Sequence, residues 1–124
     1  MKRFSEKYIN ANQLEWEKLG GGVSRKFLGY DNQIMMVSVK FDKGALGAPH
    51  QHFHTQATYC VSGKFEFEID GVKKIVEAGD GVYIEPNLLH SAVCLEEGQL
   101  IDTFSPVRED FLTGDGPSYF SDKK

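Results

Sequence analysis

The chain has 124 residues, 40% of them hydrophobic and 26% charged, with a formal net charge of −4. That length suits one domain with a single core, and the scattered basic residues form no basic face for phosphates, so we expect no nucleic acid partner. No stretch approaches the roughly 18 apolar residues of a membrane span and the N-terminus has no apolar signal segment, so we expect no membrane partner and a cytoplasmic protein.

The N-terminal segment, residues 1–22, is polar. A short helical turn is expected around residues 14–19, and the glycines at 20–22 then end regular structure. The folded body is therefore expected at 23–112, followed by a loose tail at 113–124 that holds two glycines and a proline.

The body is predicted to consist of short β-strands. Nine Phe and five Tyr favour strands, and in residues 64–70 apolar side chains alternate with charged ones, which buries one face. Turn signals recur every 8 to 12 residues or so, including a tight hairpin at Asp70-Gly71, and such spacing is typical of an antiparallel sandwich or barrel. The expected strands are 24–29, 33–42, 54–62, 64–70, 72–77, 81–85, 90–95 and 99–105.

A short helix is expected after the last strand. Ser105 has the residue type of an N-cap, Pro106 suits the first helical position, and the helix would continue through Leu112. Cys60 and Cys94 are expected to be reduced, inward-facing thiols that act as small buried hydrophobic side chains.

The stretch 44–63 carries His50, His52, His54 and Gln56 at alternate positions. Side chains two apart on an extended backbone point the same way, so three imidazoles and an amide on one face predict a metal site. His90 follows a predicted strand and a proline-containing turn, and it supplies a donor from a second element. His54 shares the parity of its neighbours and could replace His52 or Gln56 as a ligand; otherwise it supports the ligands from outside or lies on the surface.

These residues resemble the first motif of the cupin superfamily, which is Gly, five residues, His-x-His, three or four residues, an acid, six residues, Gly. The matching positions are Gly44, His50, His52, Gln56 and Gly63, with Gln56 where the acid normally stands. The second cupin motif fits at Gly79 and His90 but has Glu85, Asn87 and Cys94 in place of its proline, glycine and asparagine. The resemblance implies an all-β, single-domain fold, a double-stranded β-helix or jelly-roll barrel with short terminal helical segments, which is usually dimeric and holds a divalent metal.

A closer resemblance covers residues 13–112. The segments WEKLGGGVSRKFLGYD, HQHFHTQ, GDGVYIEPNLLH and LIDTFSPVREDFL are similar to those of KdgF-type pectin-degradation cupins. That family converts cyclic 4,5-unsaturated monouronates, released from pectin or alginate, into a linear keto form. The resemblance implies the metal ligands His50, His52, Gln56 and His90, and it implicates Asp102, Phe104 and Arg108 in catalysis or substrate binding.

The donor types themselves carry chemical information. Three neutral imidazoles and one amide leave a bound divalent ion with its full formal charge of +2, whereas the usual cupin carboxylate would reduce it to +1. Such an ion is a stronger Lewis acid and attracts anions, which suits an acidic substrate. The sequence does not identify the metal, since a site of this kind accepts Zn, Ni, Mn, Fe or Cu.

In residues 99–105, Leu100, Asp102 and Phe104 share one face. If this face looks into the barrel, burial raises the pKa of Asp102 toward the range that is useful for proton transfer. In the opposite register the carboxylate is solvated.

Arg108 could hold a substrate carboxylate through two hydrogen bonds, or it could pair with the neighbouring Glu109 or Asp110. Phe104 could form an apolar wall for a sugar face, or it could be an ordinary core residue.

The leading hypothesis is a metal-dependent, isomerase-like ring opening of 4,5-unsaturated monouronates. In it Asp102 moves the proton, Arg108 fixes the carboxylate and Phe104 contacts the substrate. The partners are then a small anionic sugar and a second copy of the chain in a homodimer. The alternatives are a metal-dependent cupin dioxygenase and a non-catalytic sugar-acid-binding cupin. An appended DNA-binding domain or helix-turn-helix pattern would distinguish a binding protein that acts as a sensor, and no such pattern is seen in this sequence.

Overall fold

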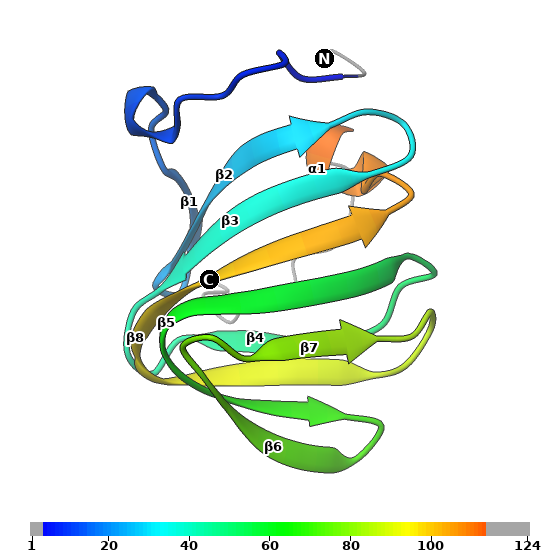
Figure 1. Cartoon of the computed structure of the whole chain (residues 1–124). Coiled ribbons are helices and arrows are strands. Elements are labelled where there is room, and N and C mark those ends of the chain that lie inside the picture. Colours follow the sequence, from blue (N-terminus) through cyan, green and yellow to red (C-terminus); the bar gives the residue numbers. More distant parts are fainter. Residues whose placement is uncertain (1–3, 114–124) are drawn as a thin grey trace.

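The structure is a computed structural model that describes residues 4–113 (Figure 1). After a 3₁₀ turn at Ala11–Gln13, the chain forms eight strands and one short helix. They are β1 (Glu17–Gly20), β2 (Val23–Tyr30), β3 (Met35–Phe41), β4 (Leu46–His50), β5 (Thr55–Ile69), β6 (Val72–Glu77), β7 (Gly81–Ile84), β8 (His90–Ser105) and α1 (Glu109–Thr113).

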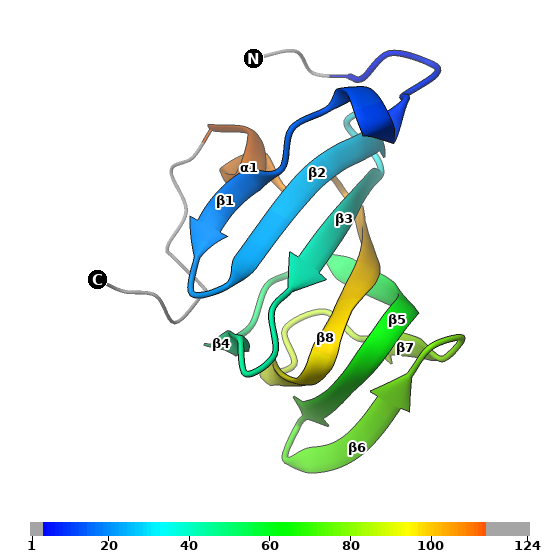
Figure 2. The same ribbon diagram turned by 90° about the vertical axis from the view of Figure 1, so that its left-hand side faces the viewer.

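All eight strands belong to one antiparallel sheet. Figure 2 shows β1, β2, β3, β8, β5 and β6 side by side in that order, while β4 pairs with β8 and β7 with β5. The two long strands, β5 and β8, pair along most of their length and bend together, so the sheet curls around an interior (Figure 1). One half of β8 pairs with β3 and the other half with β4. The all-β, single-domain prediction is confirmed.

The bend in β5 and β8 depends on two glycines, Gly63 and Gly98. Gly63 has a φ of 84°, and a Cβ atom there would lie 2.6 Å from the backbone oxygens of Glu96 and Glu97. A Cβ on Gly98 would collide with the backbone at Ser62. Because only glycine lets the two backbones approach so closely, each long strand turns here without ending.

This bend explains the main differences from the predicted strands. The strands expected at 54–62 and 64–70 are one strand, β5, and those expected at 90–95 and 99–105 are one strand, β8. The strands do not end at Gly63 and Gly98. They continue through these glycines, and the pairing of β5 with β8 shifts in register instead, as at Ser62 to Phe65 in β5. The short strands β1 and β4 were not predicted.

Two predictions near the termini are wrong. Residues 14–19 do not form a helical turn, because β1 begins at Glu17 and pairs there with β2. The C-terminal helix begins at Glu109, so Ser105 still belongs to β8 and caps no helix. The boundary expected at residue 22 remains a prediction, and the tail expected at 113–124 lies, apart from Thr113, outside the described residues.

The interior of the barrel is filled from both long strands. In β5 the side chains of Gln56, Thr58 and Cys60 are buried while their neighbours are exposed, which is the alternation expected of a sheet with one inner face. The core residues with least exposure are Met35, Val37, Cys60, Phe65, Ile84 and Cys94. Both cysteines are free and buried, as predicted. Within residues 4–113 no helix is long and apolar enough to cross a membrane.

Candidate metal centre and its cavity

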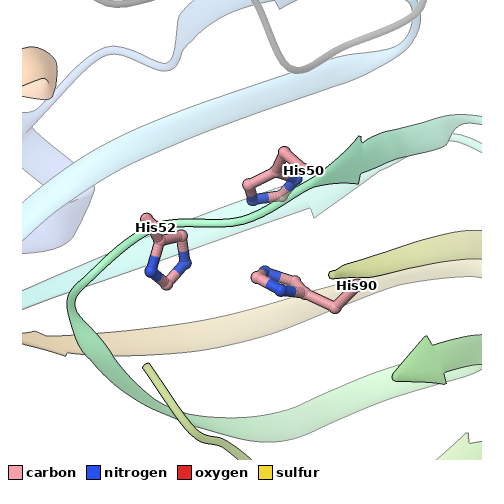
Figure 3. Close-up of side chains that lie close together, drawn as sticks. All are labelled: His50, His52 and His90. Atoms are coloured by element: carbon pink, nitrogen blue, oxygen red, sulfur yellow. The ribbon is translucent and has the colours of Figure 1, made fainter. Parts of the chain in front are cut away.

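Three histidines from different parts of the chain meet inside the barrel (Figure 3). His50 ends β4, His90 begins β8 directly opposite it in the antiparallel ladder, and His52 lies in the loop that leads to β5. One ring nitrogen of each lies within 4.8 Å of the other two. The ring centroids of His50 and His90 are 4.3 Å apart, and those of His52 and His90 are 5.0 Å apart.

The backbone fixes the orientation of all three rings. Each Nδ1 lies next to a backbone carbonyl oxygen, at 2.8 Å for His50 and Ala48, 2.9 Å for His90 and Leu88, and 3.1 Å for His52 and His54. A carbonyl only accepts, so in His50 and His90 Nδ1 carries the hydrogen and donates it, and the lone pair is left on Nε2. Nε2 of His90 is buried and has no hydrogen-bond partner among residues 4–113.

These rings are also uncharged near neutral pH. Burial, which is the largest cause in each case, lowers the pKa of His50 and of His52 to about 4 and also lowers the pKa of His90. Neutral imidazoles with a fixed tautomer and converging lone pairs are what a transition metal requires of histidine ligands. The three histidines are therefore placed as a metal site would need them.

Gln56 offers a fourth donor. Its Nε2 donates to Thr58 Oγ1 at 2.9 Å, and this bond turns its Oε1 toward His52 Nε2, 3.0 Å away. Both ring nitrogens of His52 thus face acceptor oxygens, while a neutral ring carries one hydrogen, so one of the two contacts brings two acceptors together, and a cation at Nε2 would relieve this. The set His50, His52, Gln56 and His90 thus fits a divalent metal ion.

His54 does not join this set. It is buried, but the cluster of converging ring nitrogens consists of His50, His52 and His90. Its ring stacks on Phe53 with centroids 4.0 Å apart. What it supplies to the site is its backbone carbonyl, which accepts from His52 Nδ1.

Asp102 faces the same interior from β8, so the solvated register does not occur. Thr58 Oγ1 donates to its Oδ1 at 2.6 Å, and Gln56 Nε2 lies 3.5 Å from the same oxygen. Burial raises the pKa of Asp102 to about 6, against the opposing effects of the Thr58 hydrogen bond and the charge of Arg108. A carboxyl group with this pKa can take up and release a proton near neutral pH.

Arg108 pairs with Asp110, one of the two alternatives left open by the sequence, and it also lines the cavity. Its side chain is 1% exposed and lines the cavity beside Asp102, and it also forms a two-bond ion pair with Asp110, at 3.0 and 2.7 Å. Burial alone would raise the pKa of Asp110, but the hydrogen bonds and charge of Arg108 outweigh it and lower that pKa. The guanidinium also lies 5.0 Å from the Phe104 ring centroid and 4.1 Å from that of Phe111.

A cavity of about 70 Å³ connects these groups. Among the residues that line it are two of the three histidines, the amide, the carboxyl group, two arginines and two aromatic rings: His50, His90, Gln56, Asp102, Arg25, Arg108, Phe104 and Phe111. The structure therefore brings most of the sequence-predicted site residues to the lining of one cavity, and His52 contacts one of them, Gln56.

Sequence reasoning did not identify Thr58 or Arg25, whereas it named Asp110 as a possible partner of Arg108. Thr58 had an available signal, because it follows Gln56 by two residues on the same strand and so shares its inner face. Arg25 lies in a segment that resembles KdgF-type cupins, but no local pattern marked it, since its place in the cavity depends on Phe111 of the distant helix α1 as well as on Glu17 of the neighbouring strand.

The model of the cupin domain family matches residues 37–103 of this chain. Since that match covers more than half of the chain, the chain belongs to the cupin family. Within it, the chain is 46% identical over 108 residues to the pectin degradation protein KdgF of Dickeya dadantii strain 3937, covering 86% of this chain and 98% of that protein. This places it with the KdgF-type cupins.

Solved structures agree. A RmlC-like cupin from Shewanella frigidimarina NCIMB 400 superposes with a TM-score of 0.87 at 46% identity, covering 89% of this chain and 99% of that one. KdgF from a Halomonas species superposes with a TM-score of 0.83 at 38% identity, covering 86% of this chain and 99% of that one.

Proposed function

We propose that this protein is a metal-dependent enzyme that opens the ring of 4,5-unsaturated monouronates derived from pectin or alginate, giving a linear keto sugar acid. The similarity to a pectin degradation protein supports the pathway. The observation that carries the chemistry is the position of Asp102, with its pKa of about 6, in one cavity with a neutral histidine and glutamine donor set.

The proposed reaction is an isomerisation. The C1 hydroxyl loses its proton as the bond between C1 and the ring oxygen breaks, and the oxygen released on C5 becomes the ketone as C4 gains a proton. No atom is gained or lost, so one group that accepts a proton at O1 and returns it at C4 is sufficient. Asp102 has the pKa and the position for that role.

His50, His52, Gln56 and His90 would hold a divalent ion, which supplies Lewis-acid polarisation of the sugar oxygens when bound. Arg108 contributes a buried positive charge on the cavity wall for the substrate carboxylate. Phe104, 3% exposed and on the same strand as Asp102, provides the apolar surface against which a sugar ring packs.

The test is an absorbance assay on unsaturated galacturonate and on the unsaturated uronate of alginate, with metal-loaded protein and with protein treated with a chelator. We expect metal-dependent loss of the conjugated enol-ether band. Oxygen consumption during turnover would instead support a cupin dioxygenase. Uronate binding with no turnover under any metal would support a non-catalytic binding protein.

We also propose that the protein acts as a homodimer in the cytoplasm, where its free cysteines would remain reduced. Light scattering coupled to size exclusion tests the assembly. A mass equal to one chain at working concentrations would contradict the homodimer.

A further inference from the structure

Arg25 lies outside the histidine motifs and was not among the predicted site residues, although the segment WEKLGGGVSRKFLGYD that resembles KdgF-type cupins contains it, and its side chain reaches the cavity. It belongs to β2, two strands away from β8, and lines the same space as Asp102, His90 and Arg108. Only 11% of its side chain is exposed. Burying a charged guanidinium costs free energy, and the pairing of β2 in the sheet does not require an arginine at this position. A functional role of the buried charge would account for this cost.

Its contacts hold the guanidinium in place without exhausting its donors. Nε donates to Glu17 Oε1 at 2.9 Å and Nη2 to Glu17 Oε2 at 3.4 Å. Within residues 4–113, Arg25 makes no other side-chain hydrogen bond than these two. Neither bond uses the donors on Nη1. Glu17 is 53% exposed, so water weakens its attraction and the charge of Arg25 is not fully compensated.

Aromatic rings orient the same group. The Arg25 guanidinium carbon lies 4.5 Å from the ring centroid of Phe111 in α1 and 4.9 Å from that of Phe27. Arg108 contacts the same Phe111 ring at 4.1 Å. Helix α1 packs beside β2 (Figure 1). The Phe111 ring of this helix therefore contacts the guanidinium groups of two arginines, and both arginines line the cavity. Stacked guanidinium groups lose less freedom when they bind a planar carboxylate.

Two arginines around one small cavity repel each other, and their carboxylate neighbours, together with Asp102 in the cavity, reduce this repulsion, which a bound anion would reduce further. The charge of Arg108 is partly neutralised by an ion pair with the partly buried Asp110, and the charge of Arg25 by an ion pair with the exposed Glu17. Arg25 is therefore the less neutralised of the two. A sugar carboxylate is the group in the proposed substrate that matches this excess of positive charge.

We propose that Arg25 is a second substrate-binding arginine, which acts with Arg108 to recognise the carboxylate and so restricts the cavity to anionic sugars. This inference rests on the proposed function for the identity of the substrate. Its alternative is a structural role, in which Arg25 only ties β1 and α1 to β2 through Glu17 and Phe111.

The first experiment compares R25Q with K26Q in steady-state kinetics on unsaturated galacturonate. Lys26 is the matched control, since it is the next residue of β2 and also contacts an aromatic ring, Trp16, but does not line the cavity. We expect R25Q to raise KM by roughly 10- to 100-fold, the effect of losing a charge-assisted hydrogen bond, with kcat changed less than about 3-fold. K26Q should match the wild type.

The second experiment measures binding directly. Calorimetry on metal-loaded protein compares D-galacturonate with D-galactose, which lacks the carboxylate. R25Q should lose at least about 10-fold of the preference for galacturonate. E17Q separates the two roles of Arg25, because it removes the ion pair with β1 and keeps the guanidinium. E17Q should retain the preference, and an equal loss in R25Q and E17Q would overturn the proposal in favour of the structural role.

The two proposals fail separately. If the wild type turns over unsaturated galacturonate and R25Q does so with unchanged KM and unchanged preference for galacturonate, Arg25 does not bind substrate and the proposed function stands. If no unsaturated uronate is turned over but galacturonate binding still depends on Arg25, the proposed function fails and the anion site stands.

Discussion

Strand β5 passes through two regions of the barrel interior that differ in what their inward side chains require. Near its start, Gln56 and Thr58 are buried and hydrogen-bonded into the site, whereas beyond them Cys60 and Phe65 are buried in an apolar core. Phe65 packs edge-on against Phe41 with ring centroids 5.2 Å apart. The apolar region gains stability from every contact, while the polar region keeps buried groups whose partners are incomplete.

His90 Nε2 shows the cost of the polar region most clearly, as a buried nitrogen that has no partner among the described residues. Three histidines with pKa values lowered by burial and a carboxyl group with a raised one lie close together there. Water would stabilise the charged form of each group, and burial removes that stabilisation. The proposed metal and substrate would account for this arrangement, and changes in the two regions should then have opposite consequences for activity and stability.

The largest effect is expected from H90A, which removes one of the three converging imidazoles. Bound metal should fall from about one ion per chain toward zero and kcat/KM should drop more than about 100-fold. Metal analysis and the absorbance assay measure both. H54Q is the control, since His54 lies outside the cluster and supplies only its backbone carbonyl. Metal loss in H54Q with retention in H90A would show that the ligand set includes His54.

The next effect is expected from D102N, which keeps the shape of the side chain and removes its titration. Metal content should stay near that of the wild type, while kcat falls about 100-fold because the proton carrier is lost. A D102N protein with full kcat and bound metal would remove Asp102 from the mechanism.

The pH profile sharpens this prediction. Burial raises the pKa of Asp102 to about 6, so the ionised form that accepts the proton from O1 is lost as pH falls through that value. Wild-type kcat/KM should therefore decline on the acidic side with a midpoint at or below about 6, since a nearby divalent ion favours the carboxylate. The remaining activity of D102N should lack this limb. The same limb in D102N would assign it to another group.

A smaller effect is expected from T58V, which preserves shape and removes the hydroxyl between Gln56 and Asp102. We expect kcat to fall about 10-fold with metal content nearly unchanged, because Asp102 keeps its position but loses its shortest hydrogen bond. T58S restores the hydroxyl and should recover most of the rate. If T58S is as slow as T58V, the methyl contact matters and the hydrogen bond does not.

The parts of the site that the sequence predicted are those governed by local periodicity. Alternation along a strand turned Gln56 inward in β5 and Asp102 inward with Leu100 in β8, whereas His52 lies in a loop and was identified by the motif spacing, and His54 of the same parity stays outside the cluster. The spacing of the cupin motif then linked this stretch to His90. These inferences need only the direction of one strand at a time.

What the sequence did not predict depends on contacts between distant segments. In the sequence, Gly63 and Gly98 are typical of turns. In the structure each strand bends at its glycine without ending, because the backbones of β5 and β8 approach there so closely that no Cβ atom would fit. Arg25 is in a strand whose side chains are mostly half-buried, so no alternation marks its direction. Its burial comes from Glu17 on one side and Phe111 on the other.

The smallest effect on activity is expected in the apolar region, from F65L. Phe65 is fully buried against Phe41, so the shorter side chain should lower the free energy of unfolding by about 1 kcal/mol, measured by urea denaturation. Metal content and kcat should stay within about 2-fold of the wild type, because no hydrogen bond or ligand of the site changes. A large loss of kcat in folded F65L would mean that the two regions of β5 are mechanically coupled through the bend, and that the packing of the core also sets the geometry of the histidines.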